Sequence, residues 1–439
     1  MTFDSLGLSK NILKAVNSAG YDAPSPIQAQ AIPEILNGRD IFGCAQTGTG
    51  KTAAFALPIM QMLDERGNFP RAKQFRALIL TPTRELAEQI SDNIAIYGKF
   101  LQISHCKVYG GVSQNPQIKM LLHGIDILVA TPGRLLDLFK QKHLEFDGVE
   151  YLVLDEADRM LDMGFLPDIK KIISKLPQNR QSLLFSATLS DEIKTLASDI
   201  VKDPINISVS PESPTVDKIR QSVAQLSADD KLMFLEYILK ERIADDENAR
   251  ALIFCRTKHG ANKLAKKLNA RKIGAAPIHG NKSQSARKTA LTNFKEYKIR
   301  ALVATDIAAR GIDIKDMPLV INYDLPEEPE TYVHRIGRTA RAEASGEAIS
   351  LITHEDTRLL RQIERFTKKL IPEYENNPYR VEISRGRFES VSKKQNTPQR
   401  KGGMQKNRFA NFRQNKFQSF KNAKKGGFQN RNKRPLKNK

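Results

Sequence analysis

Short apolar runs recur along the first half of the chain, and each is bounded by polar or turn residues. The runs are ALIL at 77–80, DILVA at 126–130, YLVL at 151–154 and SLLFSAT at 182–188. Longer segments with helical spacing lie between them, such as the one that begins at Glu85. Continuous apolar runs separated by helices are typical of parallel strands covered on both faces. This pattern predicts a doubly wound α/β domain.

The alternation breaks after Val201, where three prolines and several serines interrupt any regular spacing, which favours an interdomain linker. The prolines are Pro204, Pro211 and Pro214. Apolar runs then resume as ALIFC at 251–255, APIH at 276–279, ALVAT at 301–305, LVINYD at 319–324 and AISLIT at 348–353. We therefore expect a first domain over 1–208, a linker over 209–222 and a second α/β domain over 223–370.

Positive charge is concentrated at the end of the chain. Residues 385–439 contain 18 Lys and Arg against one acid, Glu389, which leaves only +4 of the net charge of +21 for residues 1–384. Six phenylalanines are interspersed, at 388, 409, 412, 417, 420 and 428. Such a segment cannot bury enough apolar surface to offset its ordering entropy, so we expect a disordered tail over 371–439. Its charge and rings suit nucleic-acid binding better than a purely solubilising role.

The three cysteines, Cys44, Cys106 and Cys255, each lie in or beside an apolar run, as reduced buried thiols of a cytosolic protein do. The seven histidines form no cluster with metal-ligand spacing, which disfavours a zinc site. The first ten residues contain no apolar leader, and no apolar run approaches the length of a bilayer span. We expect a cytoplasmic protein without a membrane partner.

A phosphate-binding loop is predicted by AQTGTGKT at 45–52, which matches GxxxxGK[ST] except for alanine at the first glycine. The candidate nucleotide ligands are Ala45, Gln46, Thr47, Gly48, Thr49, Gly50, Lys51 and Thr52. The glycines let backbone N–H groups face phosphate, Lys51 supplies positive charge and Thr52 a magnesium ligand. A chance glycine-rich turn is disfavoured, because a helix-like apolar segment follows directly. Pro58 in that segment predicts a kink or an early helix end.

An acidic pair follows a buried strand later in the chain. YLVL runs into Asp155, which is placed to hold magnesium, and Glu156 is placed to orient and deprotonate an attacking water. A carboxylate after a strand is weak evidence alone. Together with the phosphate loop, it predicts a nucleotide-hydrolysing site that uses Mg²⁺.

Asp155-Glu156-Ala157-Asp158 belongs to a series of short motifs. In chain order these are GYDAPSPIQ at 20–28, PTRELA at 82–87, TPGR at 131–134, DEAD at 155–158, SAT at 186–188, ARGID at 309–313 and HRIGRTAR at 334–341. In order and spacing, roughly residues 1–370 resemble the DEAD-box ATP-dependent RNA helicases. The segment MLDMGFLPDIKKI and the short basic tail look most like the bacterial RhlE-like group. The resemblance implies two RecA-like domains, ATP and Mg²⁺ as cofactors, and RNA as partner.

The resemblance also assigns contacts to the base and ribose. The Gln28 amide can both donate to and accept from adenine, and Tyr21 can stack on it, so ATP should be preferred over GTP. Phe3 stands 17 residues before GYDAPSPIQ, where the family has a lone aromatic. Asp313 matches the family's ribose contact. Without the other motifs, GYDAPSPIQ would be interpreted as a polar turn before a helix.

The second domain has no phosphate loop, so it is expected to complete the first domain's site. Arg338 and Arg341 lie three apart, expected on one helical face, and resemble arginine fingers for the γ-phosphate. With Lys51, Asp155 and Glu156 they form the candidate catalytic set. The residues that resemble the coupling relay are Asp158, Ser186, Thr188 and His334. Ala340 replaces the family's usual glycine between the two arginines.

RNA contacts are expected from groups that bind phosphate and sugar without reading bases, so no sequence specificity follows. In the first domain the candidates are Pro82, Thr83, Arg84, Gly110, Gly111, Thr131, Pro132, Gly133 and Arg134. In the second domain Gln284, Arg287 and Thr305 match family positions that touch the strand.

The resemblance implies that ATP and single-stranded RNA jointly close the domains and separate short duplexes locally, in ribosome assembly or RNA decay. Three alternatives remain. An ATP-gated RNA clamp would show slow turnover and a long-lived RNA complex. A tail-driven annealing chaperone would lose activity on deletion after Ser384 but not on substitution of Lys51. A DNA helicase would be stimulated by single-stranded DNA.

Overall fold

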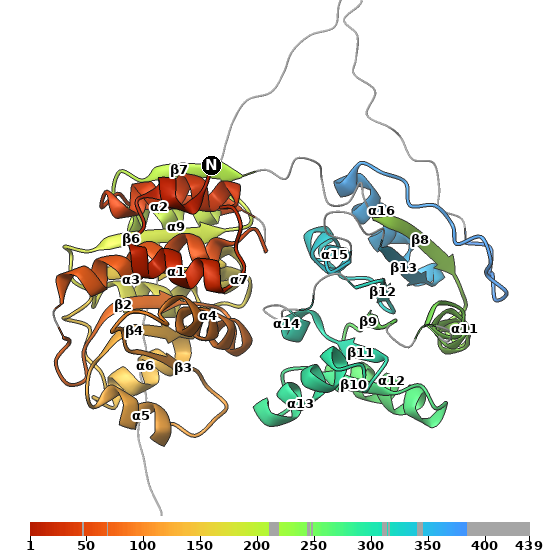
Figure 1. The fold of residues 1–439 in the computed structure, drawn as a ribbon. Coiled ribbons are helices and arrows are strands. Elements are labelled where there is room, and N and C mark those ends of the chain that lie inside the picture. The colour runs from red at the N-terminus through yellow and green to blue at the C-terminus, as the bar shows by residue number, and fades with distance from the viewer. Residues whose placement is uncertain are drawn as a thin grey trace, which may run out of the picture. The chain divides into compact units, whose positions relative to one another are not determined.

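The computed structural model describes residues 1–45, 48–67, 69–209, 219–243, 246, 249–309, 314, 317–339 and 346–383. Two α/β domains lie within these ranges, each built on its own sheet (Figure 1). The first sheet has the strand order β3-β4-β2-β5-β6-β1-β7, and the second has the order β10-β11-β9-β12-β13-β8. Every strand pair within the two sheets is parallel. The expected fold class of two doubly wound parallel-sheet domains is confirmed.

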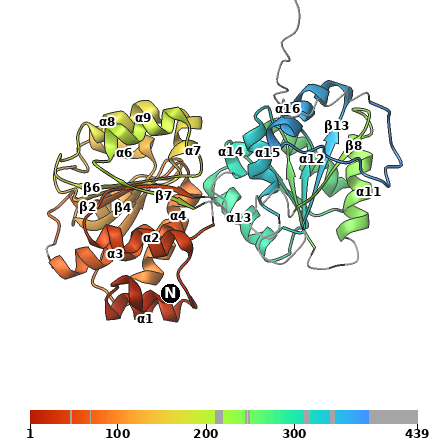
Figure 2. The same cartoon turned by 90° about the horizontal axis from the view of Figure 1, so that it is seen from above.

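Helices cover both faces of the first sheet (Figure 2). Its strands are β1 (Ile41–Ala45), β2 (Phe75–Leu80), β3 (His105–Val108), β4 (Ile125–Ala130), β5 (Tyr151–Leu154), β6 (Gln181–Ser186) and β7 (Ile205–Val209). One face carries η1 (Phe3–Leu6), α1 (Lys10–Ser18), α2 (Pro26–Leu36), α3 (Lys51–Arg66) and α4 (Arg84–Tyr97). The other carries α5 (Asn115–Leu121), α6 (Pro132–Lys140), α7 (Ala157–Asp162), α8 (Leu166–Ile173) and α9 (Asp191–Ile200). Successive residues of β2 alternate between the two cores, as the period of two requires: Ala77 and Ile79 face one, Leu78 and Leu80 the other.

The second domain repeats this build. Its strands are β8 (Arg220–Gln225), β9 (Ala251–Phe254), β10 (Ala275–Ile278), β11 (Ala301–Ala304), β12 (Leu319–Asn322) and β13 (Glu347–Ile352). One face carries α11 (Lys231–Ile243) and α12 (Lys258–Ala270). The other carries α13 (Gln284–Lys295), α14 (Asp306–Ala309), α15 (Pro329–Ile336) and α16 (Thr357–Thr367), the last of which follows η2 (His354–Asp356).

The two ends of the expected linker are strand residues, so its boundaries at 209 and 222 are corrected. β7 ends at Val209 and β8 begins at Arg220, while residues 210–218 lie outside the described part of the chain. In the described part of the chain both strands stand at the edge of their sheets, β7 beside β1 and β8 beside β13. An edge strand needs less apolar sequence than a central one, so its polar and proline-flanked sequence resembles a linker.

The early helix end expected at Pro58 is wrong, because α3 continues to Arg66. Most of its residues are buried against the first core, including Phe55, Leu57 and Ile59. Packing of this kind outweighs the roughly 3 kcal/mol cost of an interior proline.

The disorder expected from residue 371 onward is wrong for residues 371–383, which pack on the second domain. The side chains of Ile371, Tyr374 and Ile383 are buried. Glu373 forms a bridge with Val223 in the edge strand β8 of the second sheet. These apolar residues are spaced widely enough that no apolar run marks them in the sequence. Residues 384–439, with the six phenylalanines, lie outside the described residues.

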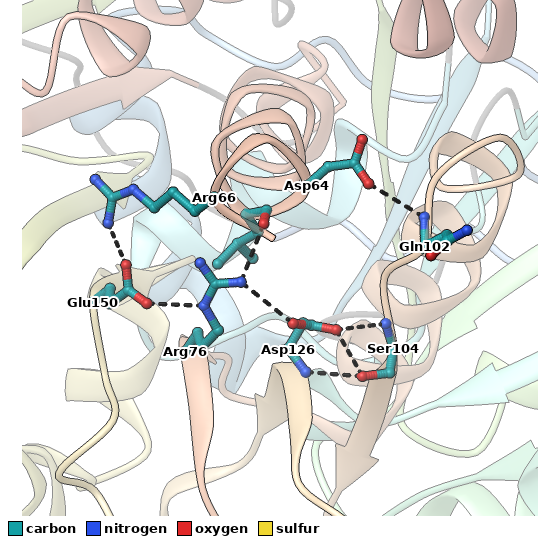
Figure 3. A network of polar contacts seen from close by, with 8 residues as sticks. Asp64, Arg66, Arg76, Gln102, Ser104, Asp126 and Glu150 are labelled. Carbon is teal, nitrogen blue, oxygen red and sulfur yellow. Dashed lines mark hydrogen bonds and ion pairs between the residues drawn. The ribbon is translucent and has the colours of Figure 1, made fainter. Parts of the chain in front are cut away.

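A network of charged and polar groups lies at the amino end of the first sheet (Figure 3). Arg76 on β2 donates from Nε to Glu150 at 2.8 Å, and its Nη1 lies 3.6 Å from a carboxylate oxygen of Asp126. Asp126 on β4 accepts from the backbone N and Oγ of Ser104, at 2.9 and 2.8 Å. Arg66, at the end of α3, also pairs with Glu150. The network joins the beginnings of β2, β3, β4 and β5 to the end of α3.

The cysteines are free thiols; Cys106 and Cys255 are buried and Cys44 is half-buried. Burial raises the pKa of all three thiols, that of Cys106 to about 12. In the described ranges, no helix combines the length and apolar character needed to cross a membrane. The same ranges contain no group of three or more His, Cys, Asp or Glu residues arranged to hold a metal ion.

Candidate nucleotide and nucleic-acid site

The candidate phosphate loop connects β1 to α3, as the motif requires. Gly50 is the N-cap of α3 with φ of 90°, and Gly48 has φ of 86°, both in the left-handed region that favours glycine. Gln46 and Thr47 lie outside the described residues. The buried Lys51 donates from Nζ to the carbonyl of Ala45 at 2.8 Å. Its ammonium therefore lies over the loop, at a helix N-terminus that favours anions.

The segment GYDAPSPIQ supports the loop from the side. Ser25 Oγ donates to the carbonyl of Thr49 at 2.6 Å, and Gln28 Nε2 donates to the carbonyl of Gly50 at 3.1 Å. Gln28 Oε1 accepts from the backbone N of Ser25 at 2.9 Å. A side chain at Gly50 would overlap the Gln28 amide. The Gln28 amide still has a second N–H and a second lone pair for further hydrogen bonds.

The candidate base-stacking residues are brought together. The rings of Phe3 and Tyr21 lie 6.4 Å apart in an edge-to-face arrangement. Tyr97, at the end of α4, lies 6.2 Å from the Tyr21 ring, and the two hydroxyl oxygens are 3.1 Å apart. Tyr21 is 38% exposed, so part of its ring is free to contact a ligand. Tyr97 was not a candidate from the sequence, because only the tertiary fold places it beside Tyr21.

Asp155 directly follows β5 and is buried, and its Oδ1 has no hydrogen-bond partner in the described part of the chain. Burial raises the pKa of Asp155 to about 6, although the positive charge of Lys51 acts in the opposite direction. A buried carboxylate oxygen without a donor fits a cation as its partner. The oxygen donors of Asp155 and Thr52 are of the kind that Mg²⁺ prefers, so these residues fit the ion.

Glu156 has φ of 55°, a left-handed conformation that is uncommon for a non-glycine residue. Its carboxylate accepts from Arg159 Nη1 at 2.7 Å, and both side chains are buried. The pair spans one turn of α7. Arg159 was not among the sequence candidates, although its spacing of three from Glu156 is the local signal for such a pair.

The candidate coupling residues of the first domain meet at the end of β6. Asp158 Oδ2 accepts from the backbone N of Ala187 at 3.1 Å, and Ser186 Oγ accepts from the backbone N of Thr188 at 3.2 Å. The DEAD and SAT motifs are therefore joined directly. His334 lies on α15 of the second domain.

The candidate RNA residues of the first domain lie after β2, β3 and β4, which are neighbours in the sheet. Thr83 caps α4 by accepting from the backbone N of Leu86 at 3.3 Å. The guanidinium of Arg84 occupies the space where a side chain at Gly111 would stand. Gly111 has φ of 79°, so both its conformation and this close approach require glycine. Pro82 and Gly110 lie in the same two loops.

The TPGR segment begins α6, with Thr131 as N-cap and Pro132 and Gly133 in the first turn. Arg134 donates from Nη2 to the carbonyl of Val112 at 3.3 Å, which ties it to the loop after β3. Because β2 and β5 are also neighbours, the candidate nucleotide and RNA residues share one carboxyl edge of the sheet.

In the second domain, Gln284 and Arg287 lie in α13, which follows β10, and Thr305 directly follows β11. β10 and β11 are paired, so the three candidates lie at neighbouring strand ends. Asp313 and Arg341 are outside the described residues.

The helical context expected for Arg338 is wrong, because α15 ends at Ile336 with Gly337 as its C-cap. Gly337 has φ of −63° and ψ of 0°, so the helix ends before Arg338 without a left-handed glycine cap. Arg335, which was not a candidate, anchors this helix: it pairs with Asp306 through two bonds of 2.6 and 2.7 Å and donates to the carbonyl of Asp324 at 2.6 Å. Arg335 thereby fixes the end of α15 from which Arg338 continues.

Two family models match the chain: "DEAD/DEAH box helicase" over residues 25–196 and "Helicase conserved C-terminal domain" over residues 230–343. The chain resembles the solved structures of S. cerevisiae Dbp5 bound to RNA and ADP BeF3 and of the DEAD-box helicase Mss116 bound to ssRNA and UDP-BeF. For Dbp5 the identity is 32% and the TM-score 0.73, over 85% of this chain and 95% of that one. For Mss116 the identity is 31% and the TM-score 0.76, over 86% and 81%.

Curated relatives give the same family. DEAD-box ATP-dependent RNA helicase 46 of Arabidopsis thaliana is 42% identical over 85% of this chain and 58% of its own length. DEAD-box ATP-dependent RNA helicase 40 of Oryza sativa is 43% identical over 81% and 45%. The chain thus spans about half the length of these plant relatives. DEAD-box ATP-dependent RNA helicase CshA of Bacillus cereus is 42% identical over 84% of this chain and 68% of its own length. With a relative 42% identical over more than two thirds of that relative's length, the chain belongs to the DEAD-box family of ATP-dependent RNA helicases.

Proposed function

We propose that this chain is an ATP-dependent RNA helicase in which ATP and single-stranded RNA jointly close the two domains and locally separate short duplexes. One observation supports this most directly. A single carboxyl edge of the first sheet carries a phosphate loop, a buried carboxylate without a donor, and adjoining loops with groups suited to a sugar–phosphate backbone. Ligands of parallel sheets bind at this edge.

In this proposal Lys51 and the backbone of the loop bind the phosphates, and Gln28, Tyr21 and Phe3 hold the adenine. Thr52 and the unpartnered oxygen of Asp155 would hold Mg²⁺. The bound ion would neutralise phosphate charge during hydrolysis. ATP preference follows from the Gln28 amide, which has one donor and one acceptor left for the base.

Glu156 is proposed as the group that orients the attacking water and accepts its proton. Arg159 holds its carboxylate in place across one helical turn. On domain closure Arg338 and Arg341 would stabilise the γ-phosphate charge, and Asp313 would contact the ribose. The hydrogen bond from the backbone N of Ala187 to Asp158 connects the DEAD motif to the loop that carries Thr188. Domain closure is proposed to act on the nucleotide site through this connection.

The RNA strand is proposed to bind through sugar–phosphate contacts, without sequence preference, at the loops after β2, β3 and β4 and at Gln284, Arg287 and Thr305. Helix α4 begins at the first of these loops and ends at Tyr97, which contacts Tyr21. One helix therefore links the candidate RNA site to the candidate base site. Coupling through a rigid element of this kind suits an RNA-stimulated ATPase.

The proposal is tested by steady-state phosphate release from ATP, with and without RNA, on the wild type and on Glu156→Gln. RNA should stimulate the wild type, and the variant should lose about 10²- to 10⁴-fold in rate, as expected for a general base. ATP-dependent RNA binding should remain in the variant, because glutamine keeps the shape and a hydrogen-bond acceptor. An ATPase that no RNA stimulates, together with tight RNA binding, would contradict the helicase proposal.

We further propose action in the cytoplasm, in ribosome assembly or RNA decay. The bacterial relative CshA is 42% identical, which supports a bacterial enzyme of this kind. The finer resemblance to the RhlE-like group stays a prediction. Comparing growth at low temperature and ribosome profiles with and without the gene would test the role in assembly.

A further inference from the structure

Three large apolar side chains are exposed at the amino end of the first sheet, opposite to the edge that carries the candidate nucleotide and RNA residues. Phe69, which precedes β2, is 79% exposed. Met120, in the last turn of α5, is 49% exposed, and Leu122, the C-cap of that helix, is 45% exposed. We name these three residues the amino-end patch. Single exposed apolar residues are common, but a group of them marks a surface that another molecule covers.

Backbone contacts bring the residues of the patch to one place. Lys73 donates from its backbone N to the carbonyl of Leu121 at 2.9 Å. A Cβ atom at Gly124 would stand 2.5 Å from the carbonyl oxygen of Arg71. The segments that precede the paired strands β2 and β4 therefore lie side by side, and together they carry the whole patch.

The same two segments are basic. Residues 69–73 and 119–124 contain no Asp or Glu and three cations, which are Arg71, Lys73 and Lys119. Arg71 and Lys119 are exposed, and neither forms an ion pair within the described part of the chain. Glu145 also contacts this corner, since its backbone N donates to the carbonyl of Lys73, but its carboxylate accepts from a glutamine amide and pairs with no cation there. The apolar patch therefore has a basic rim.

The basic rim decides which molecule suits the patch. A second copy of this chain would bring two identical rims together, which like-charge repulsion opposes. The segment 385–439, with 18 Lys and Arg against one acid, is repelled for the same reason. An RNA strand would satisfy the cations but would place hydrated phosphates against Met120 and Leu122, which have no ring on which a base can stack. An acidic polypeptide segment with apolar side chains satisfies both the rim and the patch.

We propose that the amino-end patch docks a partner protein through an acidic segment whose apolar side chains cover Phe69, Met120 and Leu122. The inference goes beyond the proposed function and does not depend on it. Strand β2, six residues long, separates the patch from the PTRELA loop by about 20 Å. A partner docked here would leave the carboxyl edge of the sheet open to ATP and RNA, and would hold the enzyme within a larger assembly while it works.

The test begins with the full chain in its source cells, with Phe69 replaced by the photo-crosslinking residue p-benzoylphenylalanine. The matched control carries the same residue in place of Phe366, which is 48% exposed in the second domain. The protein cross-linked at position 69 is identified, and its cross-linked segment is mapped by mass spectrometry. That segment is then synthesised as a peptide, and its affinity for the purified full chain is measured.

Three variants are compared with the wild type for binding of this peptide. M120Q/L122Q makes the patch polar, and R71Q/K119Q removes charge from the rim. The control is M233Q, at a site on α11 that is 43% exposed. Because all of these side chains are exposed, the unfolding midpoint and RNA-stimulated ATP hydrolysis should stay at wild-type values.

We expect an adduct with an acidic segment from position 69 and not from position 366. The peptide should bind M120Q/L122Q about tenfold more weakly and R71Q/K119Q about threefold more weakly, because apolar anchors contribute more than rim charges. M233Q should bind as the wild type does. Four results would overturn the proposal: no adduct specific to position 69, an adduct with a second copy of this chain or with RNA, a segment without net negative charge, or equal peptide binding by all variants.

Discussion

The two ends of the first domain's sheet use the same kinds of residue in opposite ways. At the amino end, the charges of Arg76, Asp126 and Glu150 are bound to one another and to Ser104 (Figure 3). At the carboxyl end, Asp155 is as deeply buried but has an oxygen without a donor, and burial raises its pKa to about 6. The amino end pairs its charged groups with one another, whereas the carboxyl end keeps a buried carboxylate oxygen for a ligand.

This difference shows where the sheet stabilises the fold and where it binds ligands. A buried charge that lacks a partner costs free energy, so a fold keeps one only where something compensates for it. The left-handed backbone of Glu156 is a second local cost at the same end. We therefore expect substitutions at the amino end to change the free energy of unfolding, and substitutions at the carboxyl end to change activity.

The largest effect is expected for Arg76→Met. Removing the arginine leaves Asp126 buried without its cation, which should lower the free energy of unfolding by about 3–5 kcal/mol. ATP hydrolysis per folded molecule should stay at the wild-type level. The measurement is chemical denaturation followed by far-UV circular dichroism, with ATPase assays well below the transition.

The double variant Arg76→Met/Asp126→Asn is the control, because it removes both charges of the pair and should regain part of the loss. Glu156→Gln provides the opposite case: activity should be lost, while stability should fall less than in Arg76→Met, because glutamine can still accept the hydrogen bond from Arg159. Equal loss of stability in Glu156→Gln and Arg76→Met would break the comparison between the two ends.

The same comparison explains what the sequence could predict. Lys51, Asp155 and Asp158 belong to short local motifs whose chemistry follows from a ligand, so they could be identified without a structure. The partners of Arg76 lie 50 and 74 residues away in the chain, and no local pattern pairs them.

Most central strands were predictable from their apolar runs, as was the edge strand β10, whereas the edge strands β3, β7 and β8 were not. These three strands carry polar residues between their apolar ones, so no continuous apolar run marks them. The end of α15 was missed for another reason: the spacing of Arg338 and Arg341 suggested a helical face, but the helix ends at Ile336, before either arginine.

A smaller effect is expected for Arg159→Met, which sharpens the comparison within the carboxyl end. Arg159 is proposed to act through Glu156, so its loss should lower kcat about tenfold, or about 1.4 kcal/mol, with KM for ATP unchanged. Arg159→Lys should restore part of kcat, since lysine keeps the positive charge but lacks the paired N–H donors of the guanidinium group. A rise in KM without a fall in kcat would show that Arg159 serves substrate binding rather than the orientation of Glu156.

The smallest effect is expected for Tyr97→Phe. The change removes only the hydroxyl that lies 3.1 Å from the Tyr21 hydroxyl and keeps the ring contact. Losing one hydrogen bond of this kind costs about 1 kcal/mol or less, so KM for ATP should rise about three- to fivefold. The RNA concentration for half-maximal stimulation of the ATPase should be unchanged, because phenylalanine keeps the ring contact with Tyr21 that holds the end of α4 in place.

The control for this prediction is Tyr237→Phe, a half-buried tyrosine of the second domain that stacks on Phe234. This control should leave KM for ATP and the RNA concentration for half-maximal stimulation unchanged. If Tyr97→Phe lowered the unfolding midpoint and left KM for ATP alone, Tyr97 would belong with Arg76 among the residues that only stabilise the fold. A raised KM at unchanged stability would instead place it with the ligand-binding end of the sheet, although it lies a full helix away from that edge.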